Sequence, residues 1–434
     1  MSSKPEIGFC GLGAMGFGMA THLIKSGYSV TGFDVWKPTL EKFAAAGGTP
    51  STSLSESAKD KAFYVCMVAT AQQAQEAIFG DDGILKELPK GATLFLTSTV
   101  PSAYAQSVEK ELRERGREDV YFIDAPVSGG AIRAADGTLS IMAGASDAAF
   151  EKGQFLLEEM SAPSKLFIVK GGIGAGSNMK MVHQVLAAIQ ILAVSEGFGF
   201  AARLGLNGKD VREEVISGKA WSWMFENRSV RTLTEDYFPG ASAVAIIMKD
   251  TGIITSMARL LNFPTPLCSI AEQAYFTGLD KGYTTQDDAG LVRLWTSEPV
   301  SSIQLTFSEE EKKAKLKLVT DLLTGIHLVA AAESVSFAKH VGLPVSQLYE
   351  LAVDAAGGSA MFKEFGAKAI PILEGKGDDG GKVLESYLEG LKNAVNAAQS
   401  IKCPLYLGSG ALNVLLHTGK SLDLSSLLRL YTGI

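Results

Sequence analysis

The sequence predicts an α/β domain with a doubly wound, mostly parallel sheet, followed by two tandem all-α domains. Three observations predict this arrangement. Short apolar and β-branched runs alternate with helical segments as far as about residue 170. Long helical segments with few candidate strands follow, and the last part of the chain repeats the middle part. The expected domains are therefore residues 1–172, 173–300 and 301–434.

The expected strands of the first domain are, in chain order, EIGFCGL, SVTGFDV, FYVCMVAT, ATLFLTST, VYFIDAPVS, LSIMAGA and KLFIVKG. Most of them do not alternate between polar and apolar residues. Both faces of each strand should then be buried, as in a parallel sheet that is covered by crossover helices. The helix expected over residues 177–203 is also too apolar to have a solvated side, so we expect it to be packed on several sides.

An internal repeat defines the third domain. When the chain is aligned with itself at an offset of 137 residues, 14 of the 46 pairs that begin at residues 180–225 are identical. Generic helix composition would not keep glutamate, glycine and aromatic residues in register together. The identical pairs include Lys180 with Lys317, Glu196 with Glu333, Gly205 with Gly342, Ser222 with Ser359 and Phe225 with Phe362. The repeated segment contains no GxGxxG pattern that follows an expected strand.

Composition and charge exclude several classes of partner. The 434 residues are 46% hydrophobic and 20% charged, with a net charge of −7 and no dense Lys/Arg run, so neither nucleic acid nor a membrane is expected as a partner. The four cysteines have no close pair and no histidine at metal-ligand spacing, which predicts no disulfide, no metal site and a cytoplasmic location. No targeting peptide is expected, and the apolar stretch at 181–195 is shorter than the roughly 20 residues that span a bilayer.

The strongest local motif is GLGAMG at residues 11–16, between the first expected strand and a helix. Glycines there allow a tight turn, let a pyrophosphate approach the backbone and let the helix pack on the strand. Asp34 follows at the end of the second strand, where a carboxylate accepts hydrogen bonds from the adenosine ribose and repels a 2′-phosphate. The motif predicts a Rossmann domain that binds NAD, with NADP less favoured, although nearby Lys37 weakens this preference.

Candidates for the substrate side follow later strands. Ser128, with Gly129 and Gly130 after it, could form a nest that binds a carboxylate; the alternative is a polar turn without a ligand. Lys180 lies one turn into the long helix, and Gln184 lies four residues later on the same face. If Lys180 is buried, loss of water favours its neutral amine, which could exchange a proton with a substrate hydroxyl. The alternative is that Lys180 is a solvated surface lysine.

Six motifs in one order resemble the β-hydroxyacid dehydrogenase family, which includes 3-hydroxyisobutyrate dehydrogenase, tartronate semialdehyde reductase and the sugar-acid dehydrogenases. They are GFCGLGAMGFGMATHLIKSG, FDV, TST, DAPVSGGAIRAADGTLSIMAG, GAGSNMKMVHQVL and MKD, from residue 6 to about residue 296. The resemblance implies that Lys180 is the catalytic lysine and that Ser128, Gly129 and Gly130 bind the substrate carboxylate. The cofactor is expected to contact Gly11, Leu12, Gly13, Ala14, Met15, Gly16, Phe33, Asp34, Val35, Val68, Ala69, Thr70, Thr99 and Lys249.

The resemblance also implies helical domains like the C-terminal domain of 6-phosphogluconate dehydrogenase. Such domains pack against each other between subunits in this family. The fused second copy could therefore stand in for a partner, which predicts a monomer with an internal pseudo-dimer, with a homodimer as the alternative.

One departure from the family pattern bears on the substrate. Most members have two asparagines at the third and fourth positions after the catalytic lysine, where this chain has His183 and Gln184. That pair, and Asp287 with Asp288, is similar to the L-threonate dehydrogenase branch, and Gln184 would reach a hydroxyl further along a polyol chain. Lys180 argues against the imine reductases, which resemble this family but replace that lysine.

These residues predict an NAD-dependent dehydrogenase of a small hydroxy acid, with L-threonate as the first expectation for the substrate. A 3-hydroxyisobutyrate- or glycerate-type acid is the second. The alternative from another class is a sensor that binds NAD without turnover.

Overall fold

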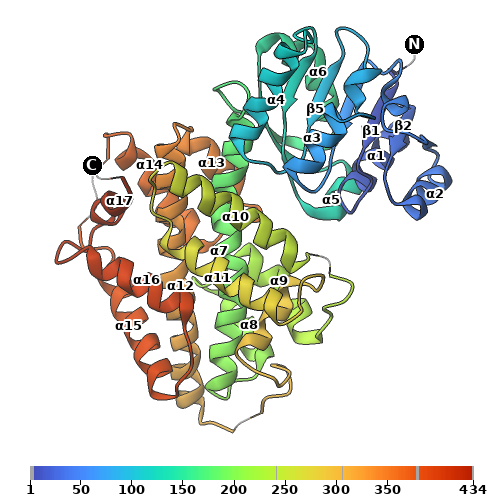
Figure 1. Cartoon of the computed structure of the whole chain (residues 1–434). Coiled ribbons are helices and arrows are strands. Elements are labelled where there is room, and N and C mark those ends of the chain that lie inside the picture. The colour runs from blue at the N-terminus through green and yellow to red at the C-terminus, as the bar shows by residue number, and fades with distance from the viewer. Residues whose placement is uncertain (1–3, 241, 305, 378–380, 433–434) are drawn as a thin grey trace. The chain divides into compact units, whose positions relative to one another are not determined.

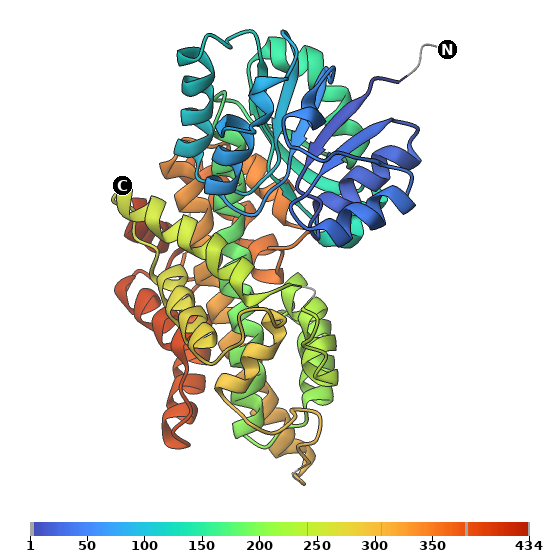
Figure 2. The same ribbon diagram turned by 45° about the vertical axis from the view of Figure 1, so that its right-hand side comes forward.

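The computed structural model describes residues 4–240, 242–304, 306–377 and 381–432 and divides into two compact units, Met1–Lys180 and Met181–Ile434. Among the described residues, all named strands belong to the first unit, and the second unit is helical (Figures 1 and 2). This arrangement confirms the predicted fold class. The division falls within one continuous helix, α7 (Ala175–Arg203).

The first unit is built on a sheet whose strand order is β3-β2-β1-β4-β5-β6-β8-β7, with β9 paired to β8. The strands β1 to β6 run parallel, whereas β8 is antiparallel to both β6 and β7. The order reverses beside β1, so ligands are expected at the carboxyl ends of β1 and β4. The bounds are β1 (Ile7–Cys10), β2 (Val30–Phe33), β3 (Thr49–Pro50), β4 (Phe63–Cys66), β5 (Thr93–Leu96), β6 (Tyr121–Asp124), β7 (Val127–Ser128), β8 (Leu139–Ala145) and β9 (Ser161–Ile168).

Helices cover both faces of this sheet, which is why its strands lack polar alternation. Phe9 belongs to one apolar cluster and its neighbour Cys10 to the other, because successive side chains of a strand point to opposite faces. The first cluster includes residues of α1 and α6, and the second includes residues of α3 and α4. The helix bounds are α1 (Gly16–Lys25), α2 (Lys37–Ala45), α3 (Ala71–Phe79), α4 (Ser102–Glu114), α5 (Gly130–Asp136) and α6 (Asp147–Met160).

The second unit contains both helical repeats. The first includes α7, α8 (Gly208–Ser217), α9 (Trp223–Thr234), α10 (Val244–Leu260), α11 (Pro266–Asp280) and the 3₁₀ segment η3 (Asp288–Leu294). The second includes α12 (Glu309–His340), α13 (Val345–Ala352), the π segment η4 (Phe362–Gly366), α14 (Ala367–Leu373), α15 (Glu385–Ser400), α16 (Tyr406–His417) and α17 (Leu424–Thr432). The helices α8 and α13 begin 137 residues apart, at 208 and 345, and α11 and α16 begin 140 apart, at 266 and 406. Equivalent helices of the two repeats therefore begin at the same offset as the sequence repeat, and three further residues are inserted in the second repeat before α16.

Two buried glutamates at equivalent positions join the repeats. The carboxylate of Glu196, on α7, accepts backbone hydrogen bonds from Leu407 (3.0 Å) and Gly408 (2.8 Å) at the start of α16. The carboxylate of Glu333, on α12, accepts hydrogen bonds from Leu267 and Cys268 at the start of α11, both at 3.0 Å. The N–H groups in the first turn of a helix have no partner within that helix. The glutamate of α7 accepts from those of α16, and the glutamate of α12 accepts from those of α11.

A second pair of reciprocal contacts joins equivalent serines. Ser222 and Ser359 form an isolated antiparallel bridge, and the hydroxyl of each caps the helical segment that follows it. Together with the exchanged glutamate contacts, this bridge gives the second unit the internal two-fold pattern of a dimer between two similar domains.

In the part of the chain that the structure describes, two helices are long and apolar enough to cross a membrane by length and composition alone. The most apolar windows of α7 and α12 have mean hydropathies of 1.7 and 1.4, but 94% and 83% of these windows are buried inside the protein. The expectation of an apolar stretch too short to span a bilayer was wrong on composition, because an 18-residue window of α7 passes this test. Its prediction as a buried helix is confirmed, and packing accounts for its composition.

Candidate active site

The glycine turn between β1 and α1 uses its three glycines for different reasons. Gly11 has φ +85°, and a Cβ there would collide with the carbonyl oxygen of Met67. A Cβ on Gly16 would collide with the carbonyl oxygen of Gly11, so these two glycines are required by the turn itself. A Cβ on Gly13 would meet no atom within 4 Å. The fold therefore tolerates a side chain at Gly13, and we expect glycine there to allow the close approach of a ligand to the backbone.

Gly13→Ala is expected to keep the fold and weaken cofactor binding. The new methyl group has room in the unliganded turn but occupies the space that a pyrophosphate needs. We expect the Kd for NAD, measured by calorimetry, to rise at least about tenfold, which is roughly 1.4 kcal/mol. The melting temperature serves as the control and should stay close to that of the wild type. Unchanged NAD affinity in a folded variant would contradict a pyrophosphate at this turn.

Asp34, directly after β2, organises the turn from the adjacent strand. Its carboxylate accepts hydrogen bonds from the backbone N–H groups of Leu12 (2.7 Å) and Trp36 (2.8 Å). The next two side chains are apolar yet solvent-exposed, Val35 at 89% and Trp36 at 66%. This arrangement suits the adenosine end of a dinucleotide, with the ribose at the carboxylate and the adenine against the apolar pair. Val35 was among the predicted contacts and Trp36 was not, although an exposed tryptophan beside the acid could have indicated it.

The other predicted cofactor residues follow β4 and β5. The N–H of Val68 donates to the hydroxyl of Ser98 (2.9 Å), and the N–H of Ala69 donates to Gln73 (2.9 Å). The hydroxyl of Thr70 caps α3 by accepting from the N–H of Gln73, so it has a structural role. Phe33 ends β2, and Thr99 lies three residues after the end of β5. All of these positions lie at carboxyl ends of parallel strands, where a doubly wound sheet binds its ligands.

Ser128 ends β7, and the two glycines after it lead into α5. Gly129 and Gly130 have φ of +143° and +73°, in the region that favours glycine. A Cβ on Gly129 would lie 2.9 Å from side-chain atoms of Arg133, whereas a Cβ on Gly130 would meet nothing within 4 Å. The backbone at Gly130 is thus open on the side where a side chain would stand.

Asp124, at the end of β6, is a residue that sequence reasoning did not select. Its buried carboxylate accepts hydrogen bonds from the backbone N–H groups of Gly174 (3.1 Å) and Ser177 (2.8 Å) and from the Ser177 hydroxyl (2.6 Å). Burial raises the pKa of Asp124 to about 6, although these hydrogen bonds oppose the rise. Asp124 therefore anchors the first turn of α7, three residues before Lys180. A lone acid at the end of a buried strand was the available signal.

Lys180 is only 5% exposed. The alternative of a solvated surface lysine is therefore wrong. A lysine this buried is held close to other groups and has lost most of its water, as an amine that exchanges protons requires.

The helical unit holds the remaining predicted residues, and Asp250 connects two of them. The side-chain amide of Gln184 donates to one carboxylate oxygen of Asp250 (2.5 Å), and the other oxygen pairs with Lys249 at 3.0 Å. Sequence reasoning named both partners but missed Asp250, which the MKD motif contains. His183 is fully buried, and a Cβ on Gly357 of the second repeat would lie 3.3 Å from its Nε2 atom.

Asp287 and Asp288, which resemble a branch of the family, have structural partners. Asp288 forms a bidentate ion pair with Arg228 at 2.9 and 3.0 Å. Asp287 pairs with Arg231 at 2.9 Å and accepts hydrogen bonds from the backbone N–H groups of Ser242 and Ala289. Both carboxylates are fully buried and stabilise the segment before η3, so neither contributes a free ligand to a site.

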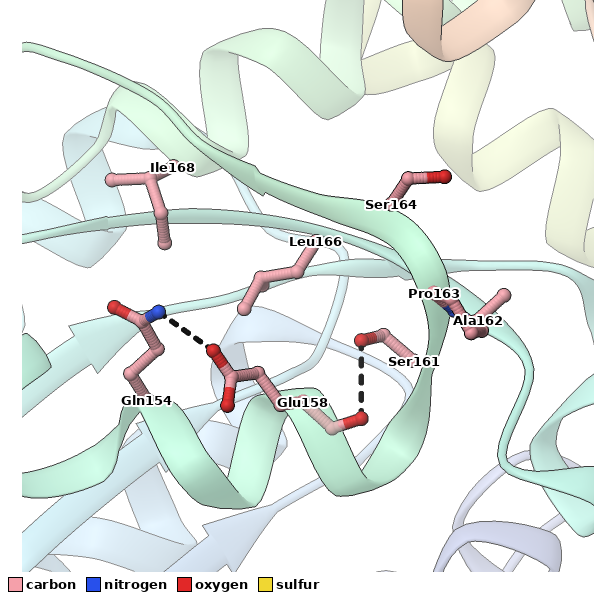
Figure 3. A pocket seen from close by; sticks show the side chains of 8 residues that line it. All are labelled: Gln154, Glu158, Ser161, Ala162, Pro163, Ser164, Leu166 and Ile168. Carbon is pink, nitrogen blue, oxygen red and sulfur yellow. Dashed lines mark hydrogen bonds between the residues drawn. The ribbon is translucent and has the colours of Figure 1, made fainter.

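A cavity of about 390 Å³ in the first unit lies between α6 and β9 (Figure 3) and contains none of the predicted residues. Three of its polar residues contact one another: Gln154 donates to the Glu158 carboxylate (2.7 Å) and Ser161 to the Glu158 carbonyl (3.4 Å). We assign no chemistry to it. Among the described residues, no group of three or more His, Cys, Asp or Glu side chains could hold a metal ion.

Comparisons with known proteins give this geometry a family. A model described as the NAD binding domain of 6-phosphogluconate dehydrogenase matches residues 6–173. A model described as the NAD-binding domain of NADP-dependent 3-hydroxyisobutyrate dehydrogenase matches residues 174–295 and again residues 314–431. The chain belongs to the β-hydroxyacid dehydrogenase family. The family confirms an NAD-binding oxidoreductase that acts on a hydroxy acid.

Individual β-hydroxyacid dehydrogenases match about two thirds of the chain. L-threonate dehydrogenase of Escherichia coli K12 is 35% identical, over 68% of this chain and 96% of that protein. Mouse mitochondrial 3-hydroxyisobutyrate dehydrogenase is 31% identical, over 66% of this chain and 86% of that protein. The crystal structure of 3-hydroxyisobutyrate dehydrogenase from Salmonella typhimurium is 33% identical with a TM-score of 0.62, over 67% of this chain and all of that chain.

One structure extends the likeness beyond the first helical repeat. The 6-phosphogluconate dehydrogenase of Plasmodium falciparum has a TM-score of 0.70 at 16% identity and covers 95% of this chain and 92% of that one. At this identity the match concerns the fold alone. It indicates that the second helical repeat also has the architecture seen in that enzyme.

Proposed function

We propose that this protein is an NAD-dependent dehydrogenase of a small sugar acid, with L-threonate as the first candidate and Lys180 as the general acid/base. The observation that carries the proposal is the buried Lys180 on α7, with Gln184 one turn further along the same helix face. The similarity to L-threonate dehydrogenases from several bacteria, at 34–35% identity, supports the substrate class.

The proposed reaction turns a carbinol into a carbonyl. When bound, NAD supplies the acceptor for the hydride that leaves the carbinol carbon. Lys180 takes the hydroxyl proton as the C=O bond forms and returns it in the reverse direction. Ser128, Gly129 and Gly130 hold the substrate carboxylate, so the carbinol carbon is fixed in position for the transfer. Asp124 acts through backbone bonds to the start of α7 and is a positioning residue.

Gln184 is the proposed reader of substrate length. Its amide nitrogen donates to Asp250, which leaves the amide oxygen to accept a hydrogen bond from a distal hydroxyl. His183 is proposed for the same wall of the site, because it lies three residues after Lys180 on α7, a spacing that places two side chains on one helix face, and is buried. Lys249, held by Asp250, contacts the cofactor from the helical unit in this proposal.

The cofactor contacts are proposed at the strand-end positions described above. The carboxylate of Asp34 would accept hydrogen bonds from the adenosine ribose and repel a 2′-phosphate, so we expect NAD to be preferred to NADP.

Asp34→Asn is expected to reduce the preference for NAD over NADP. The amide keeps the shape of the side chain but loses the negative charge, and hydrogen bonds to charged groups contribute about 1.5–3 kcal/mol. The ratio of kcat/KM for NAD to that for NADP should fall at least about tenfold. Lys37→Gln is the matched variant, and it should raise the same ratio because it removes a positive charge near the site of a 2′-phosphate. A ratio that neither variant changes would exclude discrimination at Asp34.

The substrate proposal is tested by absorbance at 340 nm with NAD and a panel of hydroxy acids. L-threonate should give the highest kcat/KM, followed by 3-hydroxyisobutyrate and glycerate. A 3-hydroxyisobutyrate- or glycerate-type dehydrogenase is the second candidate, supported by the relatives that bear the 3-hydroxyisobutyrate dehydrogenase name. Tight NAD binding without turnover of any acid in the panel would favour the non-catalytic sensor instead.

We also propose that the chain acts as a cytoplasmic monomer with an internal pseudo-dimer, and that its domains are residues 1–172, 173–300 and 301–434. The exchanged contacts of Glu196 and Glu333 support the pseudo-dimer. Sedimentation velocity should then give the mass of one chain, 45.9 kDa, whereas a doubled mass would favour a homodimer.

A further inference from the structure

A cavity of about 370 Å³ lies in the helical unit around Lys317, the counterpart of Lys180 in the second repeat. It is lined by polar and charged side chains of α12 and α15 and by the end of α8 with the loop after it. The lining residues are Glu214, Gly218, Lys219, Ala220, Lys317, Thr320, Asp321, Thr324, Ser386, Tyr387 and Gly390. A cavity of this volume can hold a small organic molecule and not only a single ion.

The register of the repeat relates this cavity to the proposed substrate face of α7. At the offset of 137 residues, Lys180, His183, Gln184 and Ala187 correspond to Lys317, Thr320, Asp321 and Thr324. All four of these α12 residues line the cavity. The α12 face that corresponds to the proposed substrate face of α7 therefore borders a cavity in the second repeat.

The contact across this face is also repeated, with the carboxylate moved to the other helix. In the first repeat, Gln184 of α7 contacts Asp250 of α10. At the later offset of 140 residues, Asp250 corresponds to Gly390 of α15. A Cβ on Gly390 would lie 2.8 Å from Cγ of Asp321, so the missing side chain makes room for the Asp321 carboxylate.

The ammonium–carboxylate pair is present in both repeats. Lys249 pairs with Asp250 in the first, whereas Lys317 pairs with both carboxylate oxygens of Asp321 in the second, at 2.8 and 2.6 Å. The Asp321 side chain is 19% exposed and that of Lys317 is 69% exposed, so the carboxylate is the more buried member of the pair and the ammonium group is open to a ligand from solvent.

Polar residues replace apolar ones elsewhere on this face. Thr324 stands where the first repeat has Ala187, and Ser386 and Tyr387 stand where it has Ile246 and Ile247. The hydroxyls of Thr320 and Thr324 donate to backbone carbonyls of α12, and each keeps lone pairs that can accept a hydrogen bond from a ligand's hydroxyl. The cavity combines ammonium groups, which bind a carboxylate, with a carboxylate and hydroxyls that bind a ligand's own hydroxyls.

We propose that the cavity around Lys317 is a second binding site, which takes a small polyhydroxy carboxylate without oxidising it. The ammonium group of Lys317 binds the carboxylate, and Asp321, Thr320 and Thr324 bind the hydroxyls. Binding is without turnover because no described strand of the second repeat leads into a GxGxxG turn that could hold a dinucleotide. This proposal rests on the proposed function in one respect: the analogy between the repeats assumes that Lys180 and Gln184 bind the substrate.

The experiment is a titration of the full chain, labelled with ¹³C at threonine methyl groups, with L-threonate and followed by NMR. The Lys180→Met variant is used without NAD, so no hydroxy acid is oxidised during the titration. Thr320→Ser and Thr324→Ser assign the two resonances by their loss. Both resonances should shift in a saturable way with L-threonate. Butyrate, which lacks the hydroxyls, and threitol, which lacks the carboxylate, should each bind at least about tenfold more weakly.

Lys317→Met and Asp321→Asn, each added to that background, should raise the Kd from these resonances at least about tenfold. Lys313→Met, one turn earlier on α12 and outside the cavity, is the matched control and should leave it unchanged. Resonances that do not move, or that move equally in Lys317→Met and the control, overturn the second site. Because the readout is local and needs no turnover, absence of hydroxy-acid oxidation would defeat the proposed function without changing this result.

Discussion

Lys180→Met is expected to lower kcat for hydroxy-acid oxidation by roughly 10²- to 10⁴-fold, the usual contribution of a positioned general acid/base. Methionine keeps the volume of the buried stem but cannot take a proton. The Kd for NAD should stay within about twofold of the wild type, because the dinucleotide is held by the glycine turn and Asp34. Stopped-flow absorbance at 340 nm measures the first property, and calorimetry measures the second.

A matched substitution separates loss of the amine from loss of a lysine in general. Lys209→Met removes an exposed lysine of α8 and should leave kcat unchanged. If Lys180→Met retained wild-type kcat, another group would have to be the base. If the variant lost NAD affinity as well, Lys180 would be acting on cofactor binding and not on proton transfer.

Glu196→Ala is expected to destabilise the protein by about 3–5 kcal/mol. The substitution leaves two buried N–H groups at the start of α16 without acceptors, at roughly 1–3 kcal/mol each, and adds a small cavity. Glu333→Ala should cost a similar amount, because it makes the equivalent contacts at the start of α11. Denaturant unfolding followed by circular dichroism measures both. Glu213→Ala, on an exposed part of α8, is the control and should change stability by less than about 0.5 kcal/mol.

The same two glutamates should make stability depend on pH. Burial raises the pKa of Glu196 and of Glu333 from the ordinary 4.5 to about 7. Between these values the folded chain keeps protons that the unfolded chain has released. Stability is therefore full below about pH 4.5 and falls as the pH rises to about 7, by about 3 kcal/mol for each carboxyl. Denaturant midpoints measured from pH 5 to pH 8 should show this decline.

Glutamine variants isolate this contribution. Glu196→Gln and Glu333→Gln have the shape of the protonated acid and no charge to bury, so each should flatten part of the decline. Near pH 5 the free energy of unfolding of each variant should be close to that of the wild type. Near pH 8 the difference should have shifted in favour of the variant. A decline of unchanged slope in the double variant would assign the pH dependence to other groups.

The parts of the site that sequence reasoning located are those whose chemistry is local. The turn at residues 11–16 and Asp34 are recognisable because a strand, a glycine pattern and an acid follow each other at short range. Asp124 and Asp250 were missed because their partners are 50 and 66 residues away, and no local pattern indicates such pairs. For Asp124 the available signal was a lone acid at the end of a buried strand, and for Asp250 it was the MKD motif that contains it.

The repeat was visible in the sequence, but its consequence was not. Alignment paired Glu196 with Glu333, yet only the structure brings each carboxylate to a helix of the other repeat. Likewise, Asp287 and Asp288 resembled family residues, whereas the structure gives them buried arginine partners. Sequence patterns identify which residues matter more readily than they identify what those residues contact.

The exchange of carboxylates between α7 and α12 happens inside one polypeptide. An equivalent pairing of two separate chains would come apart on dilution, whereas tethered partners face each other at an effective concentration on the order of millimolar. Integrity of the helical unit is then set by the unfolding equilibrium and not by abundance. Even at very few copies of this protein in a cell, each long helix would keep its contact with the other repeat.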